Sequence, residues 1–187
     1  MATDSAAIEK AISSYFLATV EATNTLYQKN LFGHLLVVIY STIDTMGLLD
    51  APANQTAATR ESFKQWVKKY LLSVPGIDFN EIDLYAARCA VLHTFTTTSA
   101  LSSAGHAKEL QYYSGNKANA KVIQLVALAK SIQGGKHLLV NLEDLTLGLL
   151  EAIGKFAPDL DHKCNRDPEC RRRLQDILQM HNIGDVF

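Results

Sequence analysis

Residues 32–49 read FGHLLVVIYSTIDTMGLL. Apolar side chains occur on every turn of a helix drawn through this stretch, and no side of it is continuously polar. A helix that is apolar all round is normally buried in the core of a protein. Asp44 is the only charged residue between His34 and Asp50. We therefore expect a central helix over 32–49, around which the rest of the chain packs.

Segments on either side of this stretch also show helical spacing. The clearest lies over 58–73, where apolar residues recur at i, i+3, i+4, i+7 and i+8; they are Phe63, Trp66, Val67, Tyr70 and Leu71. Further helices are expected over 5–28, 81–95, 142–156 and 167–181. Pro158 should end the fifth helix, since proline interrupts a helix interior. Asp167 and Pro168 suit the cap and first position of the last helix.

The region between the fourth and fifth helices has a different pattern. Ser114-Gly115-Asn116 and Gly134-Gly135 are turn signals that separate three short apolar runs. We interpret these runs as strands over 108–114, 121–129 and 137–141, although the middle one also fits a helix. The predicted fold is mainly α: a helical bundle with a small inserted antiparallel β-sheet, forming a single domain over residues 1–187.

Composition and charge fit a globular protein without a strong electrostatic bias. The chain has 187 residues, 48% of them apolar and 20% charged, with a formal net charge of −1. We expect no membrane association, because the apolar run over 35–40 is too short to span a bilayer. Residues 1–10 lack the pattern of a secretory signal. Three cysteines suit a reducing compartment, so we expect a cytoplasmic protein.

Two smaller features of the sequence have ordinary explanations. The spacing of Cys164 and Cys170 fits structural zinc poorly, and an oxidised pair is an alternative. We expect neither a metal nor another cofactor. The basic clusters, Lys64 with Lys68 and Lys69, and Arg171-Arg172-Arg173, are interpreted as solvated helix faces.

Arg88 is the charged residue that most needs an explanation. On a helix over 81–95, Leu84, Arg88, Val91 and Phe95 fall on one narrow stripe, which is otherwise apolar. Arginine does not lose its charge in proteins, so a buried one must find an acid or a ligand. Asp44, alone in its own apolar helix, is the natural partner. The sequence therefore predicts an Asp44–Arg88 contact.

His93 is a second candidate on the same helix. It follows Arg88 by five residues, which turns it about 140° round a regular helix. The two side chains are therefore expected to point apart. They can serve one site only if the helix loosens near Thr94, or if a second subunit supplies the other half.

The segment RCAVLH, residues 88–93, resembles the Arg-x4-6-His motif of the HEPN superfamily. Members of that family are helical bundles, many of them prokaryotic, found in toxin–antitoxin, abortive-infection and RNA-processing systems. The resemblance implies a homodimer with two motifs facing one cleft, and metal-independent ribonuclease activity. His93 would be the general acid or base, and Arg88 would hold the phosphate. Asp44 would orient Arg88, and Thr94 could add a hydroxyl contact.

Two departures from the family pattern leave other functions open. Active members usually carry Asn, Asp or His after the arginine, where this chain has Cys89. The inserted strand region is also absent from the minimal family fold. The alternatives are a non-catalytic HEPN-like module that binds a partner protein or a nucleotide, and a structural bundle in which Arg88 only pairs with Asp44. RNA and an antitoxin-like protein are the expected partners besides a second copy.

Overall fold

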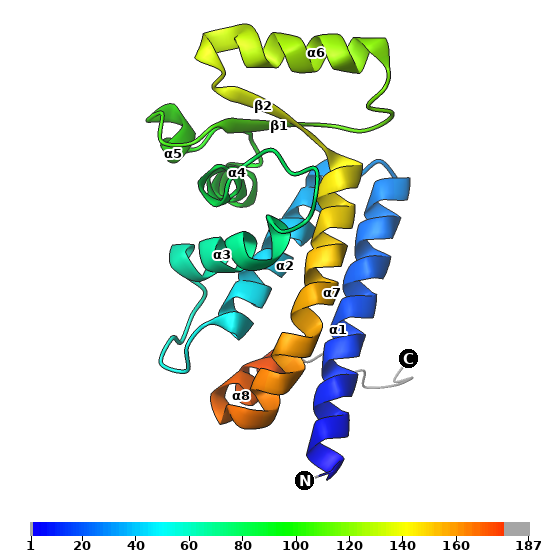
Figure 1. The fold of residues 1–187 in the computed structure, drawn as a ribbon, viewed down its shortest axis with the longest axis vertical. Helices are drawn as coiled ribbons and strands as arrows, with labels where there is room; N and C mark the ends of the chain where they lie inside the picture. The colour runs from blue at the N-terminus through cyan, green and yellow to red at the C-terminus, as the bar shows by residue number, and fades with distance from the viewer. Residues whose placement is uncertain (1, 178–187) are drawn as a thin grey trace, which may run out of the picture.

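The computed structural model describes residues 2–177, and its helices and strands are labelled in Figure 1. In chain order they are α1 (Ala2–Gln28), α2 (Phe32–Asp50), α3 (Arg60–Trp66), a π-helical turn (Val67–Leu71), α4 (Glu81–Thr94), α5 (Ala100–Ser103), β1 (Glu109–Tyr113), α6 (Ala120–Ser131), a 3-10 turn (Ile132–Gly134), β2 (His137–Asn141), α7 (Leu142–Arg166) and α8 (Pro168–Asp176). The prediction of a mainly α fold is confirmed. The predicted last helix, 167–181, is helical to residue 176, and its end lies partly outside the described residues.

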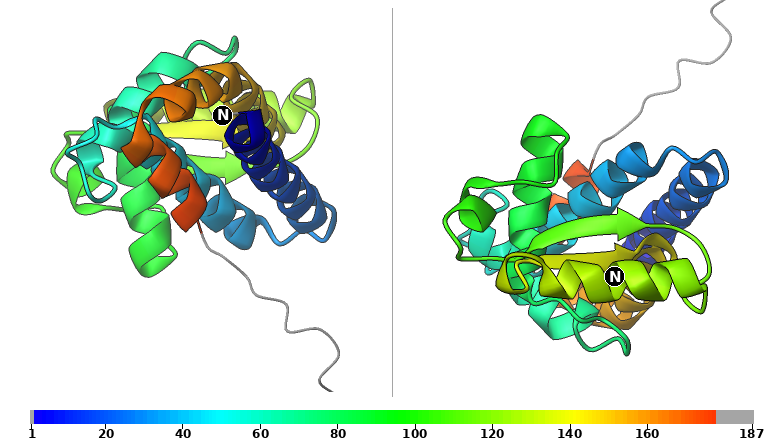
Figure 2. Two further views of the ribbon diagram at one scale, coloured as in Figure 1. Left: turned by 90° about the horizontal axis from the view of Figure 1, so that it is seen from below. Right: turned by 90° about the horizontal axis from the view of Figure 1, so that it is seen from above.

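The helices form a bundle with a small β-unit at one end (Figure 1). The long helices α1 and α7 run side by side along the molecule, and α8 folds back against them at the end opposite the sheet. Seen from above, α6 lies along the two strands and covers the end of the bundle (Figure 2). Helix α2 passes through the middle of this arrangement and contacts α1, α3, α4, α7 and α8.

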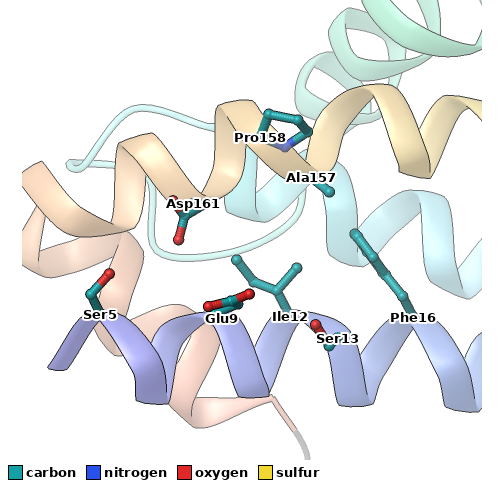
Figure 3. A pocket seen from close by; sticks show the side chains of 8 residues that line it. All are labelled: Ser5, Glu9, Ile12, Ser13, Phe16, Ala157, Pro158 and Asp161. Carbon is teal, nitrogen blue, oxygen red and sulfur yellow. The ribbon is translucent and has the colours of Figure 1, made fainter. Parts of the chain in front are cut away.

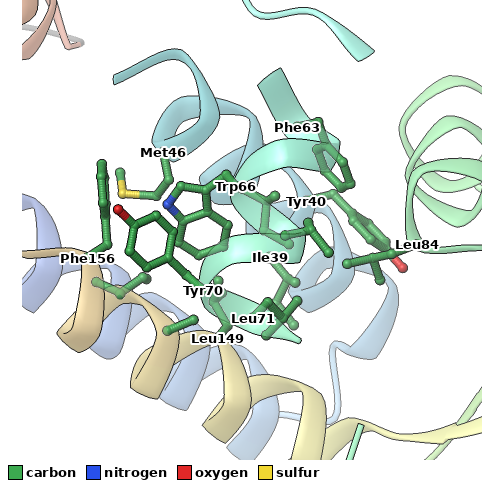
Figure 4. Packing of buried hydrophobic residues seen from close by; sticks show 14 of the residues in the cluster. Ile39, Tyr40, Met46, Phe63, Trp66, Tyr70, Leu71, Leu84, Leu149 and Phe156 are labelled. Carbon is green, nitrogen blue, oxygen red and sulfur yellow. The ribbon is translucent and has the colours of Figure 1, made fainter. Parts of the chain in front are cut away.

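The core is built around α2, as its sequence predicts. Leu35, Ile39, Tyr40 and Ile43 have no solvent exposure. The same core holds aromatic rings from neighbouring segments, with Trp66, Tyr70 and Phe156 in mutual contact (Figure 4). By length and composition alone α2 could cross a membrane, but half of that window is buried inside the fold. Helix α2 is therefore the core helix of the bundle.

The sheet differs from the antiparallel one that the sequence predicts. The first and third predicted strands are present as β1 and β2, but they are parallel and pair from Glu109 with His137 to Tyr113 with Asn141. The segment 121–129 is not a strand but part of helix α6, whose Asn119 cap accepts a hydrogen bond from the Lys121 N–H. Parallel neighbours need a crossover connection, and a helix is the usual one. The helical alternative for this apolar run is therefore the correct one.

Helix α7 is longer than predicted, because Pro158 lies inside it and the helix continues to Arg166. An interior proline costs roughly 3 kcal/mol. Beyond residue 156 the helix still buries Leu160 and Cys164, which are 1% and 0% exposed. Burial of a side chain such as that of Leu160 or Phe156 contributes about 1.5–3 kcal/mol each. Packing on both sides of Pro158 therefore offsets the cost of the proline.

Arg173 is not on a solvated face, contrary to the interpretation of the basic cluster. Its side chain on α8 is buried, and the residue is 6% exposed. The guanidinium donates hydrogen bonds to five backbone carbonyls at the end of α2 and in the loop after it, those of Leu48, Ala51, Pro52, Ala53 and Gln55, at 2.5–3.0 Å. Lys163 on α7 adds bonds to the carbonyls of Leu49 and Ala51. The last carbonyls of a helix have no partner within it and carry its negative dipole end, so both cations complete α2.

Glu143, in the first turn of α7, connects three parts of the fold. Its carboxylate accepts hydrogen bonds from the Tyr27 hydroxyl on α1 and from the Gly115 N–H, at 2.7 Å, in the loop after β1. Burial alone would raise the pKa of Glu143, but these hydrogen bonds outweigh it. The pKa of Glu143 therefore lies below its ordinary value of 4.5.

We predict that Arg173→Ala destabilises the protein by about 2–4 kcal/mol, because several carbonyls lose a charged donor. The matched control is Arg172→Ala. Arg172 is adjacent in sequence but half-exposed, and it pairs with Glu169 and Asp176 at the surface, so its loss should cost less than about 1 kcal/mol. Urea unfolding of both variants measures the difference. Equal losses would show that the carbonyl contacts of Arg173 add nothing.

We also predict a pH-dependent effect of Glu143→Gln. A carboxyl whose pKa is lowered by folding stabilises the protein fully above its unfolded pKa, and that contribution is lost as the pH falls below about 4.5. The free energy of unfolding of wild type should exceed that of the variant at neutral pH, and the gap should narrow toward about pH 3. Glu151→Gln, on the exposed side of α7, is the control and should show little pH-dependent gap. A gap for Glu143→Gln that is constant with pH would contradict this account.

Candidate functional site

The predicted contact between Asp44 and Arg88 is present, and it joins α2 to α4. Arg88 donates from Nε and Nη2 to the same Asp44 oxygen, Oδ2, at 2.9 and 2.7 Å. The two side chains are 21% and 18% exposed, so the pair lies at the edge of the core. Burial alone would lower the pKa of Arg88, but the hydrogen bond and charge of Asp44 raise it above its ordinary value. Arg88 is therefore a cation held mainly by Asp44, with Cys89 as a further contact.

Arg88 and His93 come together within one chain, so the prediction that they point apart is wrong. Arg88 Nη1 lies 3.5 Å from His93 Nε2, the outer limit for a hydrogen bond. Helix α4 ends at Thr94, and Phe95 takes the left-handed conformation with φ of 54°. The long arginine side chain reaches His93 at this helix end. Since arginine can only donate, a hydrogen bond here requires an unprotonated Nε2 on His93.

Thr94 does not join this group, although the sequence made it a candidate. Its hydroxyl donates to the Ala90 carbonyl within α4 and lies 2.8 Å from the hydroxyl of Thr96. The hydroxyls of Thr97 and Thr98 donate to the Glu109 carboxylate at the start of β1. These threonines therefore stabilise the turn after α4.

Two further residues extend the site: Phe95 on the α4 side, which the sequence placed on the stripe of Arg88, and His34 on α2, which it did not make a candidate. Phe95 was expected on a buried stripe, but it is 58% exposed, because the helix ends before it. Its ring contacts that of His34 edge to face, with centroids 5.7 Å apart, and it covers Gly33, where a Cβ would overlap the ring. His34 itself is exposed. The signal in the sequence was the Gly33-His34 pair at the start of the core helix.

These contacts define a strip along the seam between α2 and α4. Asp44 meets Arg88 at one point of the seam, and His34 meets Phe95 at another. The positions on α2 are ten residues apart, about 15 Å along a helix. His93 belongs to the same strip because it contacts Arg88 and precedes Phe95 by two residues. Arg88, His93 and His34 therefore lie along one partly exposed seam.

Two hollows of the molecule lie beside other helices, and the second of them borders the site at Asp44. One of about 440 Å³ separates α1 from α7 and is lined by Glu9 and Asp161 among others (Figure 3). A second, of about 560 Å³, lies between α1, α2 and α8 and is bordered by Asp44 and Arg173. Neither is lined by Arg88 or His93. Arg88 is 21% exposed and His93 is exposed, so both side chains reach the surface.

Within residues 2–177, no three His, Cys, Asp or Glu side chains come close enough together to hold a metal ion.

Comparisons with known proteins identify no relative. No family model, curated protein or solved structure matches this chain. The resemblance of residues 88–93 to the HEPN motif therefore stays a prediction.

We predict measurable energetic coupling between Asp44 and Arg88. Asp44→Asn and Arg88→Gln should each destabilise the protein by about 1–3 kcal/mol, because each leaves a partly buried charge without its partner. The double variant should lose less than the sum of the two, by about 1 kcal/mol or more. The control is the Glu61–Lys64 pair on α3, where Glu61 is 62% exposed. Its coupling should be below about 0.5 kcal/mol, and a similarly small value for Asp44 and Arg88 would contradict the prediction.

Proposed function

We propose that the protein is a metal-independent endoribonuclease of the HEPN type, acting in the cytoplasm, with Arg88 and His93 as its catalytic residues. The observation that supports this most is the approach of Arg88 to His93 on an exposed seam, while Asp44 holds the arginine from the other side. A fixed cation beside an exposed imidazole can bind a phosphate and transfer a proton at the same point. Asp44 is a positioning residue in this scheme.

The proposed cleavage chemistry depends on which N–H donors of Arg88 are not used by Asp44. Asp44 takes the Nε and one Nη2 donor of Arg88, whereas Nη1 faces His93. A phosphate at this place would receive hydrogen bonds from the remaining guanidinium donors, which stabilise charge developing on its oxygens. When the phosphate replaces His93 as the acceptor of the Arg88 Nη1 donor, the freed Nε2 lone pair of His93 would accept the proton of the ribose 2′-hydroxyl as general base. The 2′-oxygen then bonds to phosphorus, and the bond from phosphorus to the 5′-oxygen breaks.

RNA is the substrate that this chemistry selects. The nucleophile is the substrate's own 2′-hydroxyl, which DNA lacks, so a metal-activated water is unnecessary. The products would carry a 2′,3′-cyclic phosphate and a 5′-hydroxyl. The leaving 5′-oxygen must gain a proton, and one histidine that has just accepted a proton can return it.

We further propose that the protein acts as a homodimer, as the HEPN resemblance implies. A second copy across a twofold axis would place two Arg88–His93 pairs on facing seams and enclose the RNA between them. The exposed position of His93 leaves it accessible to such a partner. An antitoxin-like protein could bind the same seam and block it.

The sequence also allows two other functions, and an assay of RNA cleavage distinguishes both from a ribonuclease. A structural bundle needs the Asp44–Arg88 pair but has no use for His93. A non-catalytic module that binds a partner or a nucleotide would use the seam without cleaving RNA. Active HEPN members usually have a polar residue directly after the motif arginine. Cys89 occupies that position here, which is compatible with both non-catalytic alternatives.

We predict that the protein cleaves single-stranded RNA in the presence of EDTA. His93→Ala should lower the rate by about 100-fold or more, as expected for loss of a general acid or base. Arg88→Ala should lower it by a similar factor, with partial recovery in Arg88→Lys. The control is His106→Ala, an exposed histidine in the loop before β1, which should cleave like wild type. Product ends are identified by mass spectrometry.

Three experimental outcomes would contradict the catalytic roles of Arg88 and His93. Cleavage that is equal in wild type and His93→Ala would mean that a contaminant or another site is responsible. RNA binding without cleavage, lost in Arg88→Ala, would favour the non-catalytic module. Absence of both, together with a large destabilisation in Arg88→Ala, would favour the structural pair.

A further inference from the structure

The sulfur atoms of Cys164 and Cys170 lie 2.8 Å apart where α7 meets α8. Cys164 is in the last turn of α7, and Cys170 is the third residue of α8. Between them the chain turns at Asp167, whose side chain accepts hydrogen bonds from the N–H groups of Glu169 and Cys170. This cap fixes the first turn of α8 against the end of α7. The proximity of the two thiols is therefore built into the turn.

We propose that Cys164 and Cys170 form a redox site that closes to an intramolecular disulfide when the protein meets a small-molecule disulfide such as glutathione disulfide. One protein thiolate attacks the external disulfide and releases one thiol. The second protein thiolate attacks the resulting mixed disulfide and releases the other. Two electrons pass from the cysteines to the oxidant, and their two protons end on the released thiols.

The local environment makes the two thiols unequal. The hydrogen bond from Cys164 lowers the pKa of Cys170 and raises that of Cys164. Lys163, which neighbours the pair, also lowers the pKa of Cys170. In the closed pair Cys170 is therefore the more acidic of the two thiols. Cys89, the third cysteine, is on α4 and takes no part.

Access to this site depends on α8. Both cysteines have 0% exposure, so an oxidant reaches them only when α8 moves away from α7. Such local opening breaks the bonds from Arg173 to the end of α2. Reduced protein should therefore react slowly, at the rate set by opening. Once formed, the disulfide holds α8 in place, and with it Arg173 at the end of the core helix.

The oxidation state of the Cys164–Cys170 pair would therefore affect how firmly α8 is held against the end of α2. Helix α2 carries Asp44 and ends at the carbonyls that Arg173 caps. Oxidation would fix α8 on these carbonyls, whereas reduction leaves it free to open. Structural disulfides are uncommon in reducing compartments, where redox-responsive ones are the usual kind. This redox site is independent of the proposed ribonuclease activity.

The experiment treats the full chain, carrying Cys89→Ser, with glutathione disulfide or with dithiothreitol, and then alkylates the unfolded protein. We expect two alkylated cysteines after reduction and none after oxidation, without bound glutathione. Trypsin cleaves after Arg166, so oxidised protein should give the peptides of Cys164 and Cys170 joined by a disulfide. Its Tm should exceed that of reduced protein by about 5 °C or more.

Two further variants test the role of the second cysteine and the role of α8 opening. Cys164→Ser should retain bound glutathione at Cys170 and lose the Tm difference. Arg173→Ala should oxidise several-fold faster than its parent, since α8 opens more often. Oxidised parent protein that retains two alkylatable cysteines, or stops at a glutathione adduct, would overturn the proposal. Oxidation rates that are equal with and without Arg173 would overturn the role assigned to α8.

Discussion

About half of helix α2 is buried inside the fold, and polar groups on its buried side or at its buried end need partners there. The burial of Leu35, Ile39, Tyr40 and Ile43 supplies much of the apolar contact of the bundle. The same burial would leave Asp44 and the last carbonyls of the helix unsatisfied. Arg88 meets the first need and Arg173 the second, from two different helices. The positions of α4 and α8 follow in part from these two arginines.

The candidate site is a consequence of the first of these contacts. Asp44 fixes Arg88 at the edge of the core, and α4 ends one turn and a half later. At that end His93 comes within reach of the remaining guanidinium donors, and Phe95 turns outward over Gly33. A pair that stabilises the core thus also presents a positioned cation and an imidazole at the surface. Structural and functional roles of Arg88 are therefore compatible with each other.

The second contact links the C-terminal part of the described chain to the same core helix. Arg173 holds α8 against the end of α2, and the Cys164–Cys170 pair lies at the turn that begins α8. Changes at that turn reach α2 through backbone carbonyls, without a change in the core side chains. At the other end of the bundle Glu143 connects α1, α7 and the β-unit in a similar way.

The sequence by itself determined the mainly α class, the central position of α2 and the Asp44–Arg88 contact, because apolar periodicity and an isolated charge are local signals. Tertiary structure decided the rest. The run over 121–129 is a helix because its neighbours are parallel strands, and α7 passes Pro158 because packing on both sides offsets the break. Arg173 looked like a surface residue, and its five carbonyl partners are about 120 residues away in the chain. A helical wheel shows only the direction in which each side chain leaves the helix, and it places Arg88 and His93 apart. The two side chains nevertheless meet, because the arginine side chain is long and reaches His93 at the end of α4.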